Sequence, residues 1–452
     1  MVVEQALRVL IGTVDTLFVS HLGDAAVAAV GATNQLLNVA VMLFTVVGAG
    51  GTVVMSHHLG AGDERGAARA GAAAVALNSA LGVGVSAAVA LLARPALLAM
   101  QLPPVIATLA WPFLVVMGGT LFLEAHNIAA SAILRAHGRT ATVMVTGAVQ
   151  NLVNATTVAT VLFGLAGAPR LGVPGVALAG VVSRLVAAAC LRVALRRAGH
   201  RGGERQVQSL PALRAELART LPGIVRFGLP VAAENVCWSL AFVVVTGFVA
   251  RMGAAPLAAL SYSLQLSTWV SLVGGGLALA NQLRVGRLVG QGALRAAHDA
   301  PSRTLRAGLP WVGGAALLLA FLAPRLLRLF TADAAVLAAA TPALRLALLL
   351  EPGRFVSLVA VNSLRAAGDA RYPLAVAAAS MWSVWVGLAW ALGLPLGLGL
   401  SGVWLAMAAD EWLRAAITLR RWRSLRWTRP AHAARRRVAA GAAQAGVTAT
   451  RR

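Results

Sequence analysis

Apolar stretches alternate with short polar segments along almost the whole chain. Each stretch is roughly 20 residues long, which is the length that an α-helix needs to cross the hydrocarbon core of a bilayer. No segment alternates apolar and polar residues over many positions, so the pattern argues against a β-barrel. It predicts an all-α integral membrane protein with twelve transmembrane helices, at 1–19, 33–56, 70–93, 105–130, 142–165, 172–191, 224–250, 260–283, 307–323, 341–361, 373–396 and 400–419.

The composition agrees with a membrane protein. Hydrophobic residues make up 59% of the chain and charged residues only 12%, with a mean hydropathy of +0.77, whereas a water-soluble domain carries about 25% charged residues. The sequence has neither a phosphate-binding loop nor a nucleophile beside a base, so we expect no enzyme activity, no cofactor and no metal site. Cys190 and Cys237 both fall in apolar stretches and predict no disulfide.

Residues 14–67 recur 230 positions later in the same chain. Near the end of each copy, LGVPGVALA at 171–179 matches LGLSGVWLA at 398–406, with the offset reduced to 227. The chain is therefore a duplicated module with six spans per copy. An even number of spans makes the two copies parallel, related by a pseudo-two-fold axis along the membrane normal, as in many secondary transporters. Identical positions in the two copies include Phe18 and Phe248, Gly23 and Gly253, and Gln35 and Gln265.

Most of the arginines lie in alternate loops. By the positive-inside rule, this bias places both termini and the central connection in the cytoplasm. We therefore expect a multi-pass membrane protein. Together with the repeat, the charge pattern predicts four segments: an N-terminal lobe at 1–191, a cytoplasmic linker at 192–223, a C-terminal lobe at 224–425 and a basic, disordered tail at 426–452.

The net charge of +24 raises the question of nucleic-acid binding. Many of the arginines, however, follow the last span, in a segment that has no acidic residue and contains Trp422 and Trp427. Basic and aromatic residues beside a span are typical of an anchor on anionic lipid. We therefore expect anionic membrane lipids rather than nucleic acid as partners, and a monomeric protein.

The first copy begins abruptly. Glu4 corresponds to Glu234, but the second copy has the segment 226–230 ahead of that position and the first copy has nothing there. A first span that contains Glu4, Arg8 and Asp15 is also a poor transmembrane helix by itself. We expect the natural chain to begin upstream of this start.

Several motifs appear in an order that is typical of one transporter family. The first copy has Val14-Asp15-Thr16, HLG at 21–23, AAVAAVG at 25–31 and HHLGAGD at 57–63. The second copy has GLPVAAEN at 228–235, MGAAPLAAL at 252–260, VGRLVGQG at 285–292 and EPGRFVSLVAVNSLRAAGDARYP at 351–373. With these motifs the chain resembles the MATE (multidrug and toxic compound extrusion) family, and within it the NorM-like bacterial branch, over about residues 1–425.

The resemblance implies two six-helix lobes around a central cavity that opens alternately to each side of the membrane. It further implies the export of organic cations or amphiphilic drugs in exchange for H⁺ or Na⁺. These small molecules are the expected partners, and the sequence does not choose between the two ions.

Asp15 matches the aspartate that the family has in its first helix. A carboxyl group inside an apolar bundle can exchange a proton or hold a cation, and it is by default a functional candidate. Positions 4, 8, 12 and 15 share one helical face, so Arg8 offers Asp15 a static ion pair instead. Asp15 is the first candidate coupling residue.

Glu234 is the second candidate coupling residue, because it resembles the acid that some family members use in their seventh helix. Its helical face continues through Trp238 and Phe242, with no arginine one turn on. An unpaired carboxylate beside aromatic rings suits a cation, since charge attraction and cation–π contact add. The alternative is a hydrogen bond that only holds two helices together.

The fifth span departs from the family. The family pattern implies an aspartate at position 158, where this chain has a valine, so a proton relay between the first and fifth helices is incomplete. Asn151 and Asn154 can still offer oxygens to a cation or to Asp15. Hydrogen bonding between helices explains them equally well.

The tenth span departs as well, because Arg354 stands where some members have an aspartate. Glu351 lies one turn away, and an ion pair between the two would neutralise both and disfavour a Na⁺ site. Under the repeat, Arg354 corresponds to Glu124, which is beside His126 and Asn127. We keep Glu124, Glu351 and Arg354 as secondary candidates and favour structural pairing.

The amides Gln35 and Gln265 recur in the two copies, and so do Gln5 and Asn235. Equivalent positions lie at equal distances from the pseudo-two-fold axis, which suits the lining of a cavity but also plain helix packing. The expected cavity residues are Gln35, Asn38, Asn151, Asn154, Asn235, Trp238 and Gln265.

One alternative function has the same number of helices. A flippase for lipid-linked oligosaccharides, or for another lipid, would be expected to line its cavity with several arginines for a pyrophosphate group. Here the arginines within spans are few, and several have an acid nearby. A channel is disfavoured because two pseudo-symmetric halves around a midplane site suit alternating access.

Overall fold

The computed structural model describes residues 18–19, 21–100, 102–167, 169–198 and 210–449. Over these residues the chain is helical and contains no β-strand. It divides into two compact units. We call residues up to Leu229, apart from 60–62, the first lobe, and residues 60–62 together with those from Pro230 onward the second lobe.

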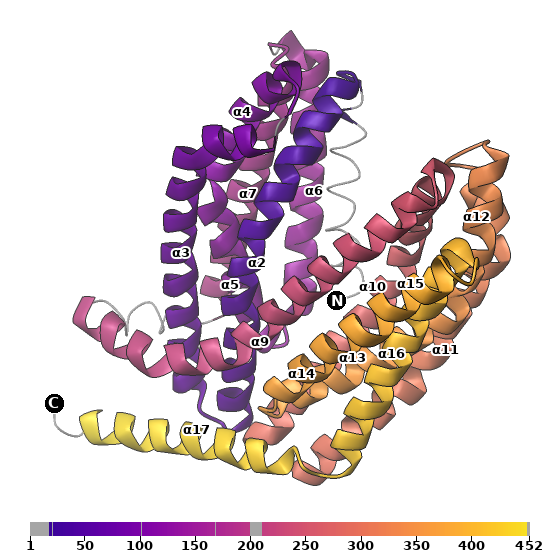
Figure 1. The fold of residues 1–452 in the computed structure, drawn as a ribbon. Helices are drawn as coiled ribbons and strands as arrows, with labels where there is room; N and C mark the ends of the chain where they lie inside the picture. The colour runs from indigo at the N-terminus through magenta and orange to yellow at the C-terminus, as the bar shows by residue number, and fades with distance from the viewer. Residues whose placement is uncertain (1–17, 20, 101, 168, 199–209, 450–452) are drawn as a thin grey trace. The chain divides into compact units, whose positions relative to one another are not determined.

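The first lobe is a bundle of long helices (Figure 1). They are α2 (Asp24–Gly60), α3 (Glu64–Ala99), α4 (Pro104–Gly119), α5 (Leu121–Ala136), α6 (Thr140–Phe163), the short 3₁₀-helix η1 (Leu165–Gly167), α7 (Gly172–Arg197) and the first part of α9 (Leu210–Arg251). Helix α3 begins after Asp63, whose carboxylate accepts a hydrogen bond from the Gly66 amide at 2.7 Å. Helix α6 ends at Gly164, which adopts the left-handed conformation that favours glycine at this position.

The second lobe contains the remainder of α9 and nine further helical segments. These are α10 (Ala254–Gln291), α11 (Leu294–Leu327), α12 (Ala334–Arg345), α13 (Ala347–Ala366), α14 (Arg371–Ser380), the π-helix η2 (Met381–Val386), α15 (Gly387–Gly393), α16 (Gly399–Arg423) and α17 (Thr428–Ala449). Helix α13 lies at the centre of this lobe, because it packs against α10, α11 and α16. Charged residues on α13 are therefore enclosed on several sides.

Each predicted span from 33–56 onward falls on helix. Eight described helices are long and apolar enough to cross a membrane, and the pair α4 and α5 makes a ninth if its 44° bend is taken as a broken span. The predicted spans 341–361 and 373–396 are each divided between consecutive helices. Nearly all of the predicted first span lies outside the described residues.

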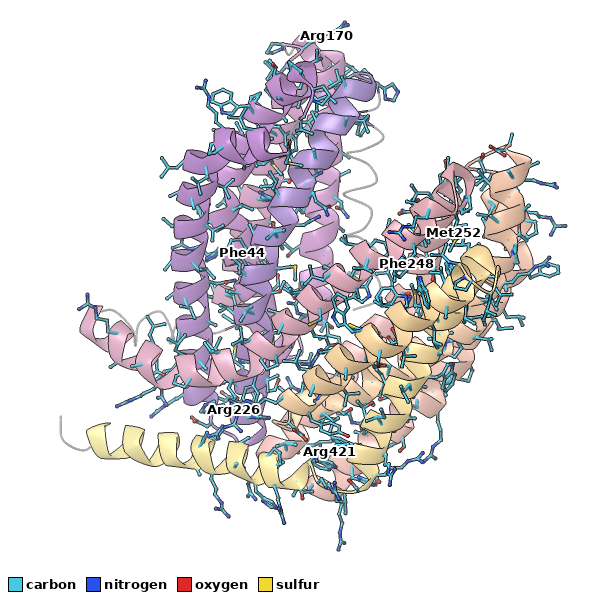
Figure 2. The ribbon with its side chains drawn as sticks, in the orientation of Figure 1. Phe44, Arg170, Arg226, Phe248, Met252 and Arg421 are labelled. Atoms are coloured by element: carbon cyan, nitrogen blue, oxygen red, sulfur yellow. The ribbon has the colours of Figure 1, made fainter. Side chains whose placement is uncertain are left out.

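Each lobe has its own apolar core. In the first lobe, Phe44 of α2 is fully buried with Leu121 and Val158 (Figure 2). In the second lobe, Phe355 of α13 packs in a cluster with Trp385 and Trp404. Aliphatic and aromatic side chains thus hold the helices of each lobe together, and polar groups inside them must find partners within the lobe.

Two predicted boundaries differ in the structure. The segment predicted as a linker at 192–223 is helical over most of its described part, because α7 continues to Arg197 and α9 begins at Leu210. Helix α9 then runs without a break through the boundary between the lobes, which falls at 229–230 rather than at 224.

The expectation of a disordered tail is wrong for the described residues after 426. Trp427 is fully buried and stacks on Trp422 with ring centroids 4.2 Å apart, and the Trp427 indole N–H donates to the Trp422 carbonyl at 3.0 Å. Arg421 pairs with Asp369 at 3.0 Å where α16 ends beside α17 (Figure 2). Composition predicted disorder because it does not reveal tertiary contacts, such as the two stacked tryptophans that hold the start of α17.

Candidate functional site

Five charged side chains of the second lobe form a chain of alternating sign. Arg354 Nη1 lies 2.7 Å from Glu351 Oε1, and Arg354 Nε lies 3.6 Å from Glu411 Oε1. Arg414 Nη2 continues the chain, at 2.8 Å from Glu411 Oε1 and 2.9 Å from Asp410 Oδ2. The order is therefore acid, base, acid, base, acid, with a carboxylate at both ends.

Helical spacing on two adjacent helices builds this charge chain. Glu351 and Arg354 are three residues apart on α13, while Asp410 and Glu411 precede Arg414 by four and three residues on α16. Because α13 packs closely along α16, the two sets meet between Arg354 and Glu411. Glu351 and Asp410 are each only 1% exposed, so the ends of the chain are its most buried parts.

Serine hydroxyls complete the two ends. Ser271 of α10 donates to Glu351 Oε2 at 2.8 Å, and Ser267 of the same helix donates to Glu351 Oε1. Ser380, the last residue of α14, donates to Asp410 Oδ1. Each terminal carboxylate therefore has an arginine and at least one hydroxyl group as partners, as a buried acid requires.

The charge chain is not balanced. Three carboxylates face two guanidinium groups, which leaves one excess negative charge when all five groups are ionised. In addition, Nε of Arg414 is buried without a hydrogen-bond partner among the described residues. An uncompensated charge inside a membrane protein costs several kcal/mol. A single bound H⁺ or monovalent cation would remove the imbalance.

Glu234 is paired, contrary to the expectation of an unpaired acid. Its Oε2 atom contacts Nη2 of Arg365 on α13, a residue 131 positions away. The expectation was wrong because a helical wheel tests only partners on the same helix. Glu234 also attracts the guanidinium group of Arg414, so this pair is electrostatically linked to the charge chain.

Aromatic rings follow Glu234 along α9, as predicted. Trp238 stacks on Phe242 with centroids 5.2 Å apart, and it also contacts the buried ring of Trp385 in η2 at 6.2 Å. Trp238 remains 45% exposed. Helix η2 is a π-helix, a local irregularity that frequently occurs at functional sites.

The first lobe contains a smaller counterpart of the charge chain. Glu124 of α5 pairs with Arg184 of α7 at 3.3 Å, and whether its role is structural stays a prediction. Arg184 also donates to the Met117 carbonyl at 3.4 Å and its own carbonyl accepts from Asn127 at 3.1 Å. The expected ion pair between Glu351 and Arg354 is present in the second lobe.

The remaining predicted residues fall into three groups. Gln35, Asn38, Asn235 and Gln265 are exposed on their own lobes, as cavity residues would be, and their role stays a prediction. Asn154 is buried and Asn151 is half-buried on α6. Asp15, the first-lobe coupling candidate, lies outside the described residues.

The sequence reasoning missed Asp410 and Glu411, the acids of α16. A signal was present, because the span 400–419 contains two acids followed by Arg414 at helical ion-pair spacing. Ser267, Ser271 and Ser380 carried no such signal, since serine is common in membrane helices. Only tertiary contacts single them out.

The pattern of sequence that defines the MatE family matches residues 1–160 and 230–391. The chain belongs to the MatE family. The second match begins where the second lobe begins, so the family pattern detects the same duplication as the internal repeat. The match confirms the predicted family. Members of this family are transporters, which confirms the prediction that the chain is not an enzyme.

Full-length relatives support the assignment. The chain is 32% identical to the uncharacterized transporter YisQ of Bacillus subtilis over 94% of this chain and 92% of that protein. It is 26% identical to the probable multidrug resistance protein NorM of Thermotoga maritima, over 96% of this chain and 92% of that protein. Both alignments cover both MatE lobes.

Solved structures share the fold. A transporter of the MOP superfamily from Pyrococcus furiosus superposes with a TM-score of 0.83 at 20% identity, over 95% of this chain and 94% of the other. The Vibrio cholerae MATE transporter VcmN in its bent form gives a TM-score of 0.83 at 18% identity, over 96% of both chains. The predicted all-α, two-lobe membrane fold is confirmed.

Proposed function

We propose that this MatE protein is a secondary active antiporter, which exports organic cations or amphiphilic drugs in exchange for H⁺ or Na⁺. The observation that carries the proposal is the charge chain of the second lobe, with three carboxylates and two guanidinium groups. Relatives named probable multidrug resistance protein NorM support the substrate class. Asp15 remains the proposed coupling residue of the first lobe.

The excess carboxylate provides a physical basis for exchange. One H⁺ or Na⁺ neutralises the charge chain, and its departure restores a negative charge that attracts a cation. Glu234 connects this buried charge to a more accessible surface, because it pairs with Arg365 and precedes the exposed Trp238 on α9. An organic cation next to Trp238 would gain both charge attraction and cation–π contact.

The experiment that tests the proposal is efflux of a cationic dye from proteoliposomes, with H⁺ and Na⁺ gradients imposed separately. We expect one of the two gradients to drive efflux by the wild-type protein. Asp410→Asn and Glu234→Gln should abolish that efflux at unchanged abundance. Glu216→Gln, which makes the same change on α9 at a pair with Arg69, is the matched control and should transport normally.

The outcomes separate two failures. Efflux that depends on neither gradient would reject antiport. Gradient-driven efflux that survives unchanged in both Asp410→Asn and Glu234→Gln would keep antiport but reject these residues as coupling sites. Asp15→Asn, tested in the same assay, probes the first lobe.

We further propose that the protein lies in the bacterial inner membrane with both termini in the cytoplasm, as a monomer that contacts anionic lipids through its basic tail and loops. The alternate arginine-rich loops support this orientation. In a chain with Cys190→Ala and Cys237→Ala, a membrane-impermeant maleimide added to intact cells should label Thr331→Cys but not Ser424→Cys. The reverse labelling pattern would show that the protein has the opposite orientation in the membrane.

A further inference from the structure

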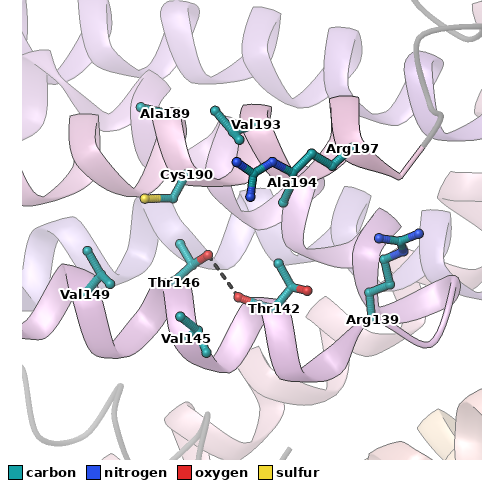
Figure 3. Close-up of a pocket in the computed structure, with 10 residues that line it drawn as sticks. All are labelled: Arg139, Thr142, Val145, Thr146, Val149, Ala189, Cys190, Val193, Ala194 and Arg197. Atoms are coloured by element: carbon teal, nitrogen blue, oxygen red, sulfur yellow. Dashed lines mark hydrogen bonds between the residues drawn. The ribbon is translucent and has the colours of Figure 1, made fainter.

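A groove runs along the seam between α6 and α7 of the first lobe (Figure 3). It has a volume of about 450 Å³, within the usual range of ligand sites. Its walls are mostly apolar, and the Thr146 hydroxyl in its floor is already satisfied by the Thr142 carbonyl at 3.0 Å. The lining residues are Arg139, Thr142, Val145, Thr146, Val149, Ala189, Cys190, Val193, Ala194 and Arg197.

The two charged residues of the groove are attached to the helices near one of its ends. Figure 3 shows Arg139 and the backbone of Arg197 toward that end and Val149 and Ala189 toward the other, while the Arg197 guanidinium group extends back along α7 toward Val193. Neither arginine makes an ion pair within the described part of the chain, so both guanidinium groups are available to an external anion. The groove therefore combines two cationic side chains with an otherwise mostly apolar lining.

The repeat shows how the side chains of this seam differ from those of its counterpart in the second lobe. At the equivalent seam of the second lobe, Asp369 replaces Arg139 and Arg421 replaces Ala194. Arg421 pairs with Asp369 at 3.0 Å and lies over the ring of Tyr372, the counterpart of Thr142, at 4.5 Å. Large, mutually neutralising side chains thus fill the second seam, while small residues and two arginines leave the first one open to an external anion.

The length of the groove matches one leaflet of a bilayer. From Arg139 to Val149, α6 rises by about 15 Å, which is roughly half of a hydrocarbon core of about 30 Å. A ligand with an anionic head at the arginines and a hydrocarbon tail along Val145, Val149 and Val193 would therefore fit the groove from end to end.

We propose that the groove between α6 and α7 is a binding site for an anionic phospholipid. Its phosphate binds at the end where Arg139 and Arg197 are attached, and both exposed side chains turn toward it to donate hydrogen bonds. One acyl chain lies along the apolar wall. Basic pockets between membrane helices are known to hold anionic head groups. The site is independent of the proposed antiport, because it uses no residue of the charge chain.

The test is native mass spectrometry of the full chain in detergent, with phosphatidylglycerol or phosphatidylcholine of identical acyl chains added. We expect the wild type to retain phosphatidylglycerol in preference to phosphatidylcholine. Arg139→Gln with Arg197→Gln should lower that retention roughly tenfold or more. Arg192→Gln with Arg196→Gln removes the same charge from exposed positions outside the groove on α7, and should leave retention unchanged.

A second pair of variants tests the apolar part without any change of charge. Ala189→Trp should fill the trough and reduce phosphatidylglycerol binding, while Leu185→Trp, on an exposed part of α7 outside the groove, should not. If the two double arginine variants lost phosphatidylglycerol retention equally, general surface charge would explain the binding and the proposal would be overturned. Displacement of the lipid by millimolar inorganic phosphate, or full retention in Ala189→Trp, would overturn it as well.

Discussion

Arg354 and Glu411 form, in the second lobe, the ion pair that Glu124 and Arg184 form in the first, with the charges exchanged. The Nε–Oε distances are 3.6 Å and 3.3 Å. Position 354 is the repeat of 124 at the offset of 230, and position 411 is the repeat of 184 at the offset of 227. The contact between these two helices has therefore kept an ion pair in both lobes, while only the second lobe adds Glu351, Asp410 and Arg414 to it.

The exchanged pair predicts that, in the first lobe, either helix can carry the acid as long as the other carries the base. Glu124→Arg or Arg184→Glu alone places two like charges together and should destabilise the protein by about 3 kcal/mol. Because Glu124 and Arg184 have no further charged partner among the described residues, the double exchange should restore most of that loss. Thermal unfolding in detergent, followed by intrinsic fluorescence, measures the effect. A double variant as unstable as the singles would show that polarity matters.

The charge chain predicts opposite responses to the loss of an acid and the loss of a base. Asp410→Asn leaves two carboxylates with two guanidinium groups and should preserve or raise the melting temperature. Arg414→Gln leaves three carboxylates with one guanidinium group and should lower it strongly. Arg414→Lys keeps the charge and should be intermediate, which separates charge from lost packing. Equal destabilisation by Asp410→Asn and Arg414→Gln would contradict the excess of negative charge.

Asp63, in the loop between α2 and α3, predicts a dependence of stability on pH. Partial burial by itself would raise the pKa of Asp63, but the Gly66 amide and His58, whose Nδ1 lies 2.9 Å away, lower that pKa below its ordinary value. The ionised form therefore stabilises α3 fully above pH about 4, the ordinary value, and this contribution is lost as pH falls through the lower, folded-state value.

The variant that tests this is Asp63→Ala. It should lower stability by about 1 kcal/mol at neutral pH, the usual contribution of a helix N-cap. The difference from wild type should shrink as the pH of the melting experiment is lowered toward 3. Glu64→Gln, at the next and exposed position, is the control and should follow the wild type at every pH. A difference that grows in acid would contradict the sign.

Trp427 predicts that the segment after α16 belongs to the folded second lobe. Trp427→Ala removes a fully buried ring and should cost about 3 kcal/mol or more. Trp311→Ala makes the same chemical change at a ring that is 74% exposed, and should cost little in detergent. Limited proteolysis with trypsin should then cut α17 faster in Trp427→Ala than in the control. Identical melting and digestion would mean that the two stacked tryptophans do not hold the tail.

Local spacing was enough to predict some site contacts. The pair Glu351 and Arg354 followed from positions three apart on one helix, and the run of Trp238 and Phe242 followed from the face of Glu234. The pairing of Glu234 with Arg365 did not, because these residues are 131 positions apart and meet only when α9 and α13 come together. The three serines that donate to the terminal carboxylates of the charge chain could not be predicted for the same reason.

The sequence alone determined the membrane class, the duplication and the family, because these depend on apolar length, on offset identities and on motifs along the chain. Tertiary structure decided which ionisable groups lie close enough to form ion pairs. Glu411 between Arg354 and Arg414, and the two arginines beside the α6–α7 groove, owe their character to neighbours on other helices. Electrostatic energy depends on distance through a low-dielectric interior, and packing rather than sequence separation sets that distance.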